Sequence, residues 1–80
     1  MTGGILTLTT GYQQISPAPY GARYLNLRSA TGNGTITLSV DGKSPAGFLL
    51  AGEARQYINT SPHLVWALGT AGNTLYWDAV

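Results

Sequence analysis

The feature of this sequence that most limits its fold is a strict alternation of apolar and polar residues. Over residues 35–40, isoleucine, leucine and valine occupy the even positions and threonine or serine the odd positions. A period of two places successive side chains on opposite sides of an extended strand, so the pattern predicts a strand with one buried face. Residues 23–28 alternate in the same way, with Leu25 and Leu27 on one side. No window of about 11 residues free of Gly and Pro has helical spacing, so little or no helix is expected.

Turn residues divide the chain into about seven short strands. Residues 31–34, Thr-Gly-Asn-Gly, tolerate positive φ and predict a hairpin that pairs strand 23–28 with strand 35–40. The Gly-rich loop 69–73 predicts a second hairpin. Short strands spaced by about ten residues favour a small antiparallel β-sandwich or a small barrel. The expected strands are residues 5–10 (with 12–15 as an extension), 23–28, 35–40, 48–50, 55–58, 63–68 and 74–80.

The composition predicts one domain that depends on association. A chain of 80 residues has room for a single core, so residues 1–80 are taken as one domain. Domains of this size bury only about 60–65% of their unfolded surface and usually add disulfides, a metal or oligomerisation. The chain has no cysteine and one histidine, His63, which disfavours disulfides and a zinc site. Self-association is therefore expected. We expect neither a metal nor a cofactor.

Charge limits the classes of partner. Only 9% of the residues are charged and the net charge is +1, whereas nucleic-acid binders carry clustered Lys and Arg. No apolar run approaches the ~18 residues that a membrane span requires. The start of the chain lacks the basic and apolar regions of a signal peptide. We therefore expect no nucleic-acid or membrane partner, and synthesis in a cytoplasm.

Groups that could support catalysis are scarce. The carboxylates are Asp41, expected to hydrogen-bond within a turn before Gly42, Glu53, expected in a solvated loop, and Asp78 in the last strand. Asp78 is expected to pair with an arginine across the sheet or to face a neighbouring subunit. His63 follows a proline, and no serine stands in a Gly-x-Ser-x-Gly motif. No catalytic residue is assigned, and the chain is not expected to be an enzyme.

The aromatic residues are the best candidates for an interface. Trp66 and Phe48 are expected in the core. In the last strand Trp77 and Tyr76 point to opposite sides, so one of them must lie off a single buried face. Tyr57 stands beside Ile58 in the same relation. Exposed aromatic side chains on a surface with few charges mark a protein interface or a sugar-stacking platform. The candidate interface residues are Arg55, Tyr57, Tyr76 and Trp77.

The order of several segments resembles small virion structural proteins of tailed bacteriophages, particularly head decoration (cement) proteins. The segments are LTTGYQQI (residues 8–15), ARYLNL (22–27), LSVDG (38–42), LAGE (50–53) and GNTLY (72–76). The resemblance implies a β-sandwich or β-tulip, often trimeric, seated on the major capsid protein lattice of the virion. Many decoration proteins are longer and have an N-terminal arm, and here only residues 1–4 could serve as one.

These observations favour a capsid decoration protein that binds the assembled lattice, stabilises it and self-associates, with a homotrimer favoured. It would be made in the host bacterial cytoplasm and located on the capsid surface. A tail, baseplate or spike component is the alternative. A carbohydrate-binding module is a further alternative, and it would require Trp77 or Tyr76 beside hydrogen-bonding Asn and Gln side chains.

Overall fold

The structure, a computed structural model, describes residues 2–17 and 23–80 of the chain. These residues form strands and a single turn of 3-10 helix, so the prediction of an all-β fold with essentially no helix is confirmed. No helix among the described residues is long and apolar enough to cross a membrane. The elements are β1 (Thr2–Thr7), β2 (Gln13–Gln14), β3 (Tyr24–Ser29), β4 (Ile36–Ser39), β5 (Gly47–Leu49), β6 (Ala54–Ile58), η1 (Pro62–Leu64), β7 (Trp66–Leu68) and β8 (Thr74–Ala79).

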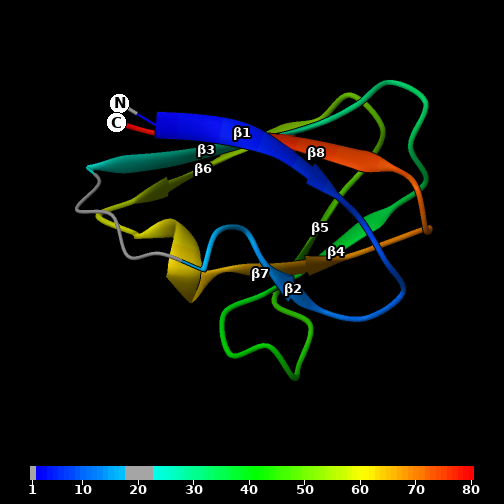
Figure 1. Ribbon diagram of the computed structural model, residues 1–80, viewed down its shortest axis with the longest axis horizontal. Helices are drawn as coiled ribbons and strands as arrows, with labels where there is room; N and C mark the ends of the chain where they lie inside the picture. Colours follow the sequence, from blue (N-terminus) through cyan, green and yellow to red (C-terminus); the bar gives the residue numbers. More distant parts are fainter. Residues whose placement is uncertain (1, 18–22) are drawn as a thin grey trace.

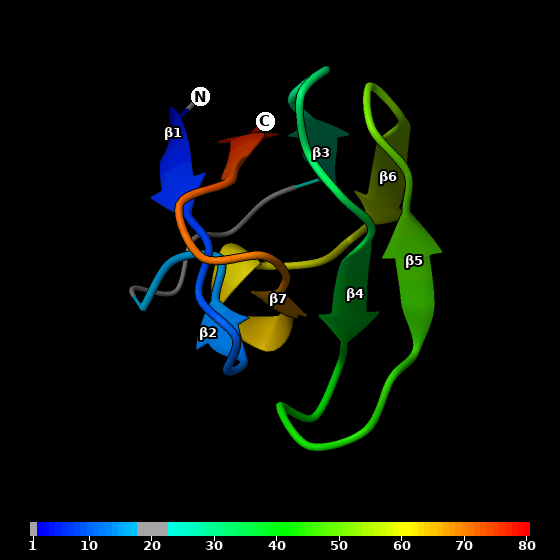
Figure 2. The same cartoon turned by 90° about the vertical axis from the view of Figure 1, so that its right-hand side faces the viewer.

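The strands form two four-stranded antiparallel sheets (Figure 1). The first sheet has the order β1-β8-β3-β6, and the second has the order β2-β7-β4-β5. The outermost strands of the two sheets, β6 and β5, lie on the same side of the sandwich (Figure 2). In the first sheet Thr2 lies opposite Ala79 and Thr7 opposite Thr74, so the first and last strands pair along their whole length. The start of β1 and the end of β8 therefore lie side by side (Figure 1).

Every connection between consecutive strands crosses from one sheet to the other, except the connection from β4 to β5. Both predicted hairpins are therefore wrong. Strand β3 pairs with β6 and β8 rather than with β4, and β7 pairs with β2 and β4 rather than with β8. A two-residue hairpin of the favoured type needs positive φ at both central residues. Among the described residues Gly32, Asn33 and Gly34 do not have it; positive φ occurs at Gly42, Gly52, Asn59 and Gly72.

The core lies between the sheets and follows the alternation seen in the sequence over residues 25–27 and 36–38. The alternation fails at the end of β4, where Ser39 is buried and Val40, just beyond the strand, is 57% exposed. Leu25 and Leu27 on β3 and Ile36 and Leu38 on β4 are almost completely buried, as the period-two pattern predicts. The buried hydrophobic residues are Leu8, Ile15, Leu25, Leu27, Ile36, Leu38, Leu49, Val65, Ala67, Leu75 and Ala79, with Leu6, Tyr57 and Trp77 packed partly against them.

Two aromatic residues expected in the core lie outside it. Ala67 on β7 and Val65 immediately before the strand are both buried, so Trp66 between them points to the outer side of the second sheet. On that side, a Cβ added at Gly42 would lie 3.1 Å from the Trp66 indole. The loop that follows β4 therefore lies close against this ring. Phe48 is 55% exposed because its neighbour Leu49 takes the inner position on β5. A short strand gives too few positions to fix which face is buried from sequence.

The segment considered as an N-terminal arm, residues 1–4, belongs to the first sheet over its described part. Thr2, Gly3 and Gly4 lie opposite Ala79, Asp78 and Trp77 of β8. Residue 1 lies outside the described residues. In this structure residues 2–4 are therefore strand rather than a separate arm.

Candidate functional site: the outer face of the first sheet

The candidate site is the side of the first sheet that points away from the core. Because Leu25 and Leu27 are buried, the side chains between them on β3 must project to the opposite side. The same alternation applies to β8, where Leu75 and Ala79 are buried. We call this side the outer face; its residues are Gly3, Ile5 and Thr7 on β1, Thr74, Tyr76 and Asp78 on β8, Tyr24, Asn26 and Arg28 on β3, and Ala54, Gln56 and Ile58 on β6.

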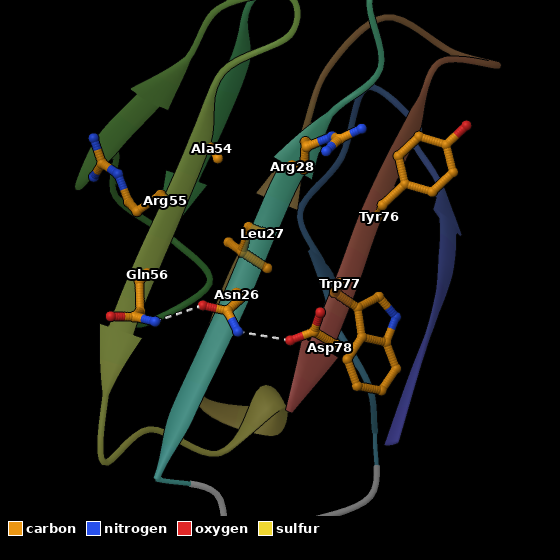
Figure 3. Close-up of a pocket in the computed structure, with 9 residues that line it drawn as sticks. All are labelled: Asn26, Leu27, Arg28, Ala54, Arg55, Gln56, Tyr76, Trp77 and Asp78. Carbon is orange, nitrogen blue, oxygen red and sulfur yellow. Dashed lines mark hydrogen bonds between the residues drawn. The ribbon is translucent and has the colours of Figure 1, made fainter. Parts of the chain in front are cut away.

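A row of polar side chains crosses the outer face. The strand register places Asn26 between Asp78 on one side and Gln56 on the other, with Gly3 beyond Asp78. Gln56 Nε2 donates to Asn26 Oδ1 at 2.8 Å, and Asn26 Nδ2 donates to Asp78 Oδ1 at 2.7 Å (Figure 3). The row is thus a chain of hydrogen bonds with a fixed direction. Asp78, expected to pair with an arginine across the sheet or to face a neighbouring subunit, accepts a hydrogen bond from the Asn26 amide of its own chain rather than from an arginine of the described residues.

The neighbouring row combines an aliphatic, an aromatic and a cationic side chain. Its members lie opposite one another across four strands in the order Ile5, Tyr76, Arg28 and Ala54. Ile5 is 64% exposed and Tyr76 is 44% exposed. Among the residues that the structure describes, none forms a hydrogen bond or an ion pair with the Arg28 guanidinium. This row therefore offers an apolar contact area beside a guanidinium that forms no bond to the described residues.

A shallow hollow of about 750 Å³ lies between the two rows (Figure 3). Ala54 has the smallest side chain that lines it, which leaves space between the larger side chains of Arg28 and Gln56. Both donors and acceptors therefore face one open depression beside an aromatic ring. The lining residues are Asn26, Leu27, Arg28, Ala54, Arg55, Gln56, Tyr76, Trp77 and Asp78.

The structure separates the four residues predicted for an interface. Tyr76 lies on the outer face, whereas Trp77 packs partly against the core, which confirms that only one of them faces inward. Tyr57 also packs partly against the core, and its neighbour Ile58 is 66% exposed. Arg55 lies on the inner side with Tyr57 and closes the gap between the edges of the two sheets.

Arg55 connects the neighbouring edges of the two sheets. Its Nη2 donates to the Phe48 carbonyl oxygen of β5 at 3.5 Å. A side chain at Gly47 would collide with the same guanidinium, so the glycine leaves the space that the arginine fills. Arg55 thereby spans from β6 to β5, where neither sheet has a further strand. It supports the edge of the sandwich rather than the outer face.

The sequence does not reveal that Ile5, Asn26, Arg28 and Gln56 form one group. The alternation within residues 23–28 does place Asn26 and Arg28 opposite Leu25 and Leu27, so part of the signal was present. The missing information was strand order, because residues on β1, β3, β6 and β8 become neighbours only when the sheet forms.

Other candidate groups are accounted for by local structure. Asp41 Oδ1 accepts hydrogen bonds from the backbone N–H groups of Ser44 and Lys43 and from the Ser39 hydroxyl, each at 2.8 Å. These bonds, with the two backbone donors as the larger cause, lower the pKa of Asp41 to about 2. The predicted turn role of Asp41 is confirmed. Glu53 lies exposed in a turn, as expected, where its Oε1 accepts from the Leu50 N–H at 2.6 Å.

His63 lies in η1, and its Nδ1 is 2.7 Å from the Ser61 hydroxyl. No group of three His, Cys, Asp or Glu side chains within residues 2–17 and 23–80 is placed to hold a metal ion.

Comparison with known proteins gives no match: no family model fits the chain, and no curated protein or solved structure is significantly similar to it.

Proposed function

We propose that this chain is a structural binding protein that docks through the outer face of its first sheet onto a protein lattice, most specifically as a decoration protein of a phage capsid. The observation that carries the proposal is the exposure of apolar side chains around a hydrogen-bonded polar row. Ile5, Ile58 and Tyr76 are 44–66% exposed on this face. Exposed aliphatic and aromatic groups on a surface with few charges are typical of docking surfaces.

The polar row suits such a surface because its side chains are already ordered. Asn26 is held by Gln56 and Asp78 and does not need to find its position during binding. Pre-ordered groups reduce the entropy lost on association. The Arg28 guanidinium can bond to carbonyl or carboxylate oxygens of a partner. The resemblance to head decoration proteins supports a capsid as the partner, and a protein that binds only the assembled lattice stabilises it by mass action.

Carbohydrate binding is the second candidate, and a specific arrangement favours it. Tyr76 lies one row away from Asn26 and Gln56, beside a hollow of about 750 Å³. An aromatic ring next to amide and carboxylate groups can stack on the apolar side of a sugar ring while the polar groups bond its hydroxyls. This matches the requirement set by the sequence for a carbohydrate-binding module, with Tyr76 rather than Trp77 as the aromatic residue.

Co-sedimentation tests the lattice proposal. The protein is mixed with expanded phage capsids and, separately, with free capsid subunits of the same phage. We expect strong binding to capsids only, because several neighbouring subunits are needed at lattice spacing. Tyr76→Ala should weaken binding by about 2 kcal/mol, or roughly thirty-fold, if Tyr76 is a hot spot. Phe48→Ala is the matched control, since Phe48 is 55% exposed on the other sheet.

Co-sedimentation with phage tails and binding to a glycan array distinguish the alternatives. Equal binding to subunits and capsids, or binding to tails alone, would contradict the capsid proposal and favour a tail component. Binding on a glycan array that Tyr76→Ala abolishes, without binding to capsids, would favour the carbohydrate module. Capsid binding that Phe48→Ala weakens and Tyr76→Ala leaves intact would place the interface on the second sheet.

A further inference from the structure

Strand β1 is an edge of the first sheet, and within the described part of the chain it pairs with β8 alone. The register and one hydrogen bond show which of its backbone groups are unpaired. Leu8 N–H donates to Asn73 O at 2.7 Å, continuing the pairing in which Thr7 lies opposite Thr74. Antiparallel pairs alternate between bonded and non-bonded residues, so Gly3, Ile5 and Thr7 direct their N–H and C=O groups away from β8. Among the described residues no other backbone group bonds to them.

The strand also lacks the features by which proteins usually block such an edge. Natural edge strands carry charged residues, proline or a bulge, or are covered by another segment. Residues 2–7, Thr-Gly-Gly-Ile-Leu-Thr, contain neither a charge nor a proline, and their pairing with β8 has no bulge. Gly3, Gly4 and Ile5 are exposed. The other edge of this sheet, β6, differs because Arg55 bridges it to β5.

We infer that β1 pairs antiparallel with β1 of a second copy of this chain, with Ile5 on the two-fold axis, to give a continuous eight-stranded sheet. This register bonds all three unpaired residues, since Ile5 faces Ile5 of the second copy and Gly3 faces Thr7. Because all three belong to the outer face, the outer faces of both copies stay on one side. The inference does not depend on the proposed function, and it gives a two-fold pair rather than the trimer expected from the resemblance.

Side-chain shape favours the same register. On the outer face the two Ile5 side chains would contact each other, and β-branched pairs stabilise directly opposed positions. On the inner side Leu6 of one copy lies opposite Gly4 of the other. A Cβ at Gly4 would be 3.2 Å from the Trp77 indole nitrogen, so the indole lies directly beneath this glycine. Leu6 of the second copy would cover the part of the Trp77 ring that β1 leaves open.

The inferred dimer is weak in isolation. One pair of short strands buries less than the roughly 1,200 Å² of a stable interface, so association should depend on concentration. Sedimentation equilibrium from about 5 to 500 µM covers the range of such complexes. We expect a monomer–dimer equilibrium for the natural chain, with a blue shift of Trp77 fluorescence as the dimer forms.

Two pairs of variants test the position of the interface. Ile5→Lys places two ammonium groups opposite each other and should abolish the dimer. Ile58→Lys is the matched control, because Ile5 and Ile58 are 64% and 66% exposed on the two edge strands of the same face. In Ile5→Cys the two Cα atoms would be about 5.5 Å apart, which suits a disulfide. Since the chain has no natural cysteine, mild oxidation should cross-link Ile5→Cys and leave Ile58→Cys monomeric.

The inference would be overturned if the natural chain stays monomeric at about 500 µM. It would also be overturned if Ile5→Cys cross-links no faster than Ile58→Cys. A trimer, or a dimer that Ile58→Lys disrupts and Ile5→Lys does not, would have the same consequence. Capsid binding is not part of this measurement, so failure of the dimer and failure of the lattice proposal can be told apart.

Discussion

Asn33 is expected to be the most important loop side chain for stability. It lies in the connection from β3 to β4, where its side chain forms three hydrogen bonds. Nδ2 donates to the Ser29 hydroxyl at 3.0 Å and to the Thr74 carbonyl at 2.5 Å, and Oδ1 accepts from the Thr74 N–H at 3.2 Å. Ser29 is 1% exposed, so one of these partners is fully buried. The side chain therefore fixes the connection between the sheets to the start of β8.

Asn33→Ala removes all three bonds. A typical bond contributes about 0.5–1.5 kcal/mol, and a loss of about 2–3 kcal/mol is expected after allowance for non-additivity. The total stability of a domain of this length is about 4–12 kcal/mol, so the loss is a large fraction. Thermal unfolding followed by circular dichroism should show a decrease in Tm of roughly 10–20 °C.

Asn73→Ala is the control, because Asn73 is adjacent to Thr74 and its side chain forms no hydrogen bond with the described residues. Its Tm should change by a few degrees at most. Asn33→Asp should be as damaging as Asn33→Ala at neutral pH, since the new carboxylate cannot donate to the Thr74 carbonyl. The defect should decrease in acid, where the protonated carboxyl can donate. An Asn33→Ala variant within about 0.5 kcal/mol of the natural chain would refute the reasoning, because that is the range of an ordinary surface substitution.

Two further predictions concern the loop that follows β4. Hydrogen bonds lower the pKa of Asp41 in the folded state from 3.8 to about 2. The carboxylate therefore stabilises the fold above about pH 4, and this contribution is lost as the pH falls toward 2. The free energies of unfolding of Asp41→Ala and the natural chain, measured in urea, should differ at pH 6 and converge near pH 2. Gly42 has a φ of +75° and lies against the Trp66 indole, so Gly42→Ala should destabilise the fold by about 1–2 kcal/mol. Gly32→Ala, with open space at its Cβ, should change the same urea midpoint very little, and equal effects of the two glycine variants would contradict this explanation.

The sequence predicts strands well where several residues alternate and predicts their neighbours poorly. The buried faces of β3 and β4 follow directly from residues 25, 27, 36 and 38. The hairpin expected between these strands does not form, because turn-forming residues in a connection of this length also allow the chain to cross to the other sheet. In the folded chain, Asn33 in this connection bonds to Thr74, a residue 41 positions away. Such a contact has no local signature.

In the candidate site, too, the sequence indicates which residues could be exposed but not which residues become neighbours. The sequence shows that either Tyr76 or Trp77 must lie off the single buried face, and the structure identifies Tyr76 as the exposed one. Its grouping with Arg28 and Ile5 depends on β8 lying between β1 and β3. Strand order of this kind results from the packing of the whole sandwich. It is therefore absent from the pattern of any one strand.

The central position of β8 has a consequence for the order of events during biosynthesis. This strand is the last in the chain, yet it lies between β1 and β3 and pairs with both. On the ribosome, β1 and β3 remain without their shared neighbour until residues 74–79 have left the exit tunnel, so the first sheet cannot close before β8 has emerged. Pairing between the two ends of a chain also requires a large loop to close, which slows folding. A pulse-labelled nascent chain should therefore stay sensitive to protease until residues 74–79 have emerged, and removal of residues 74–80 should prevent folding rather than merely lower the Tm.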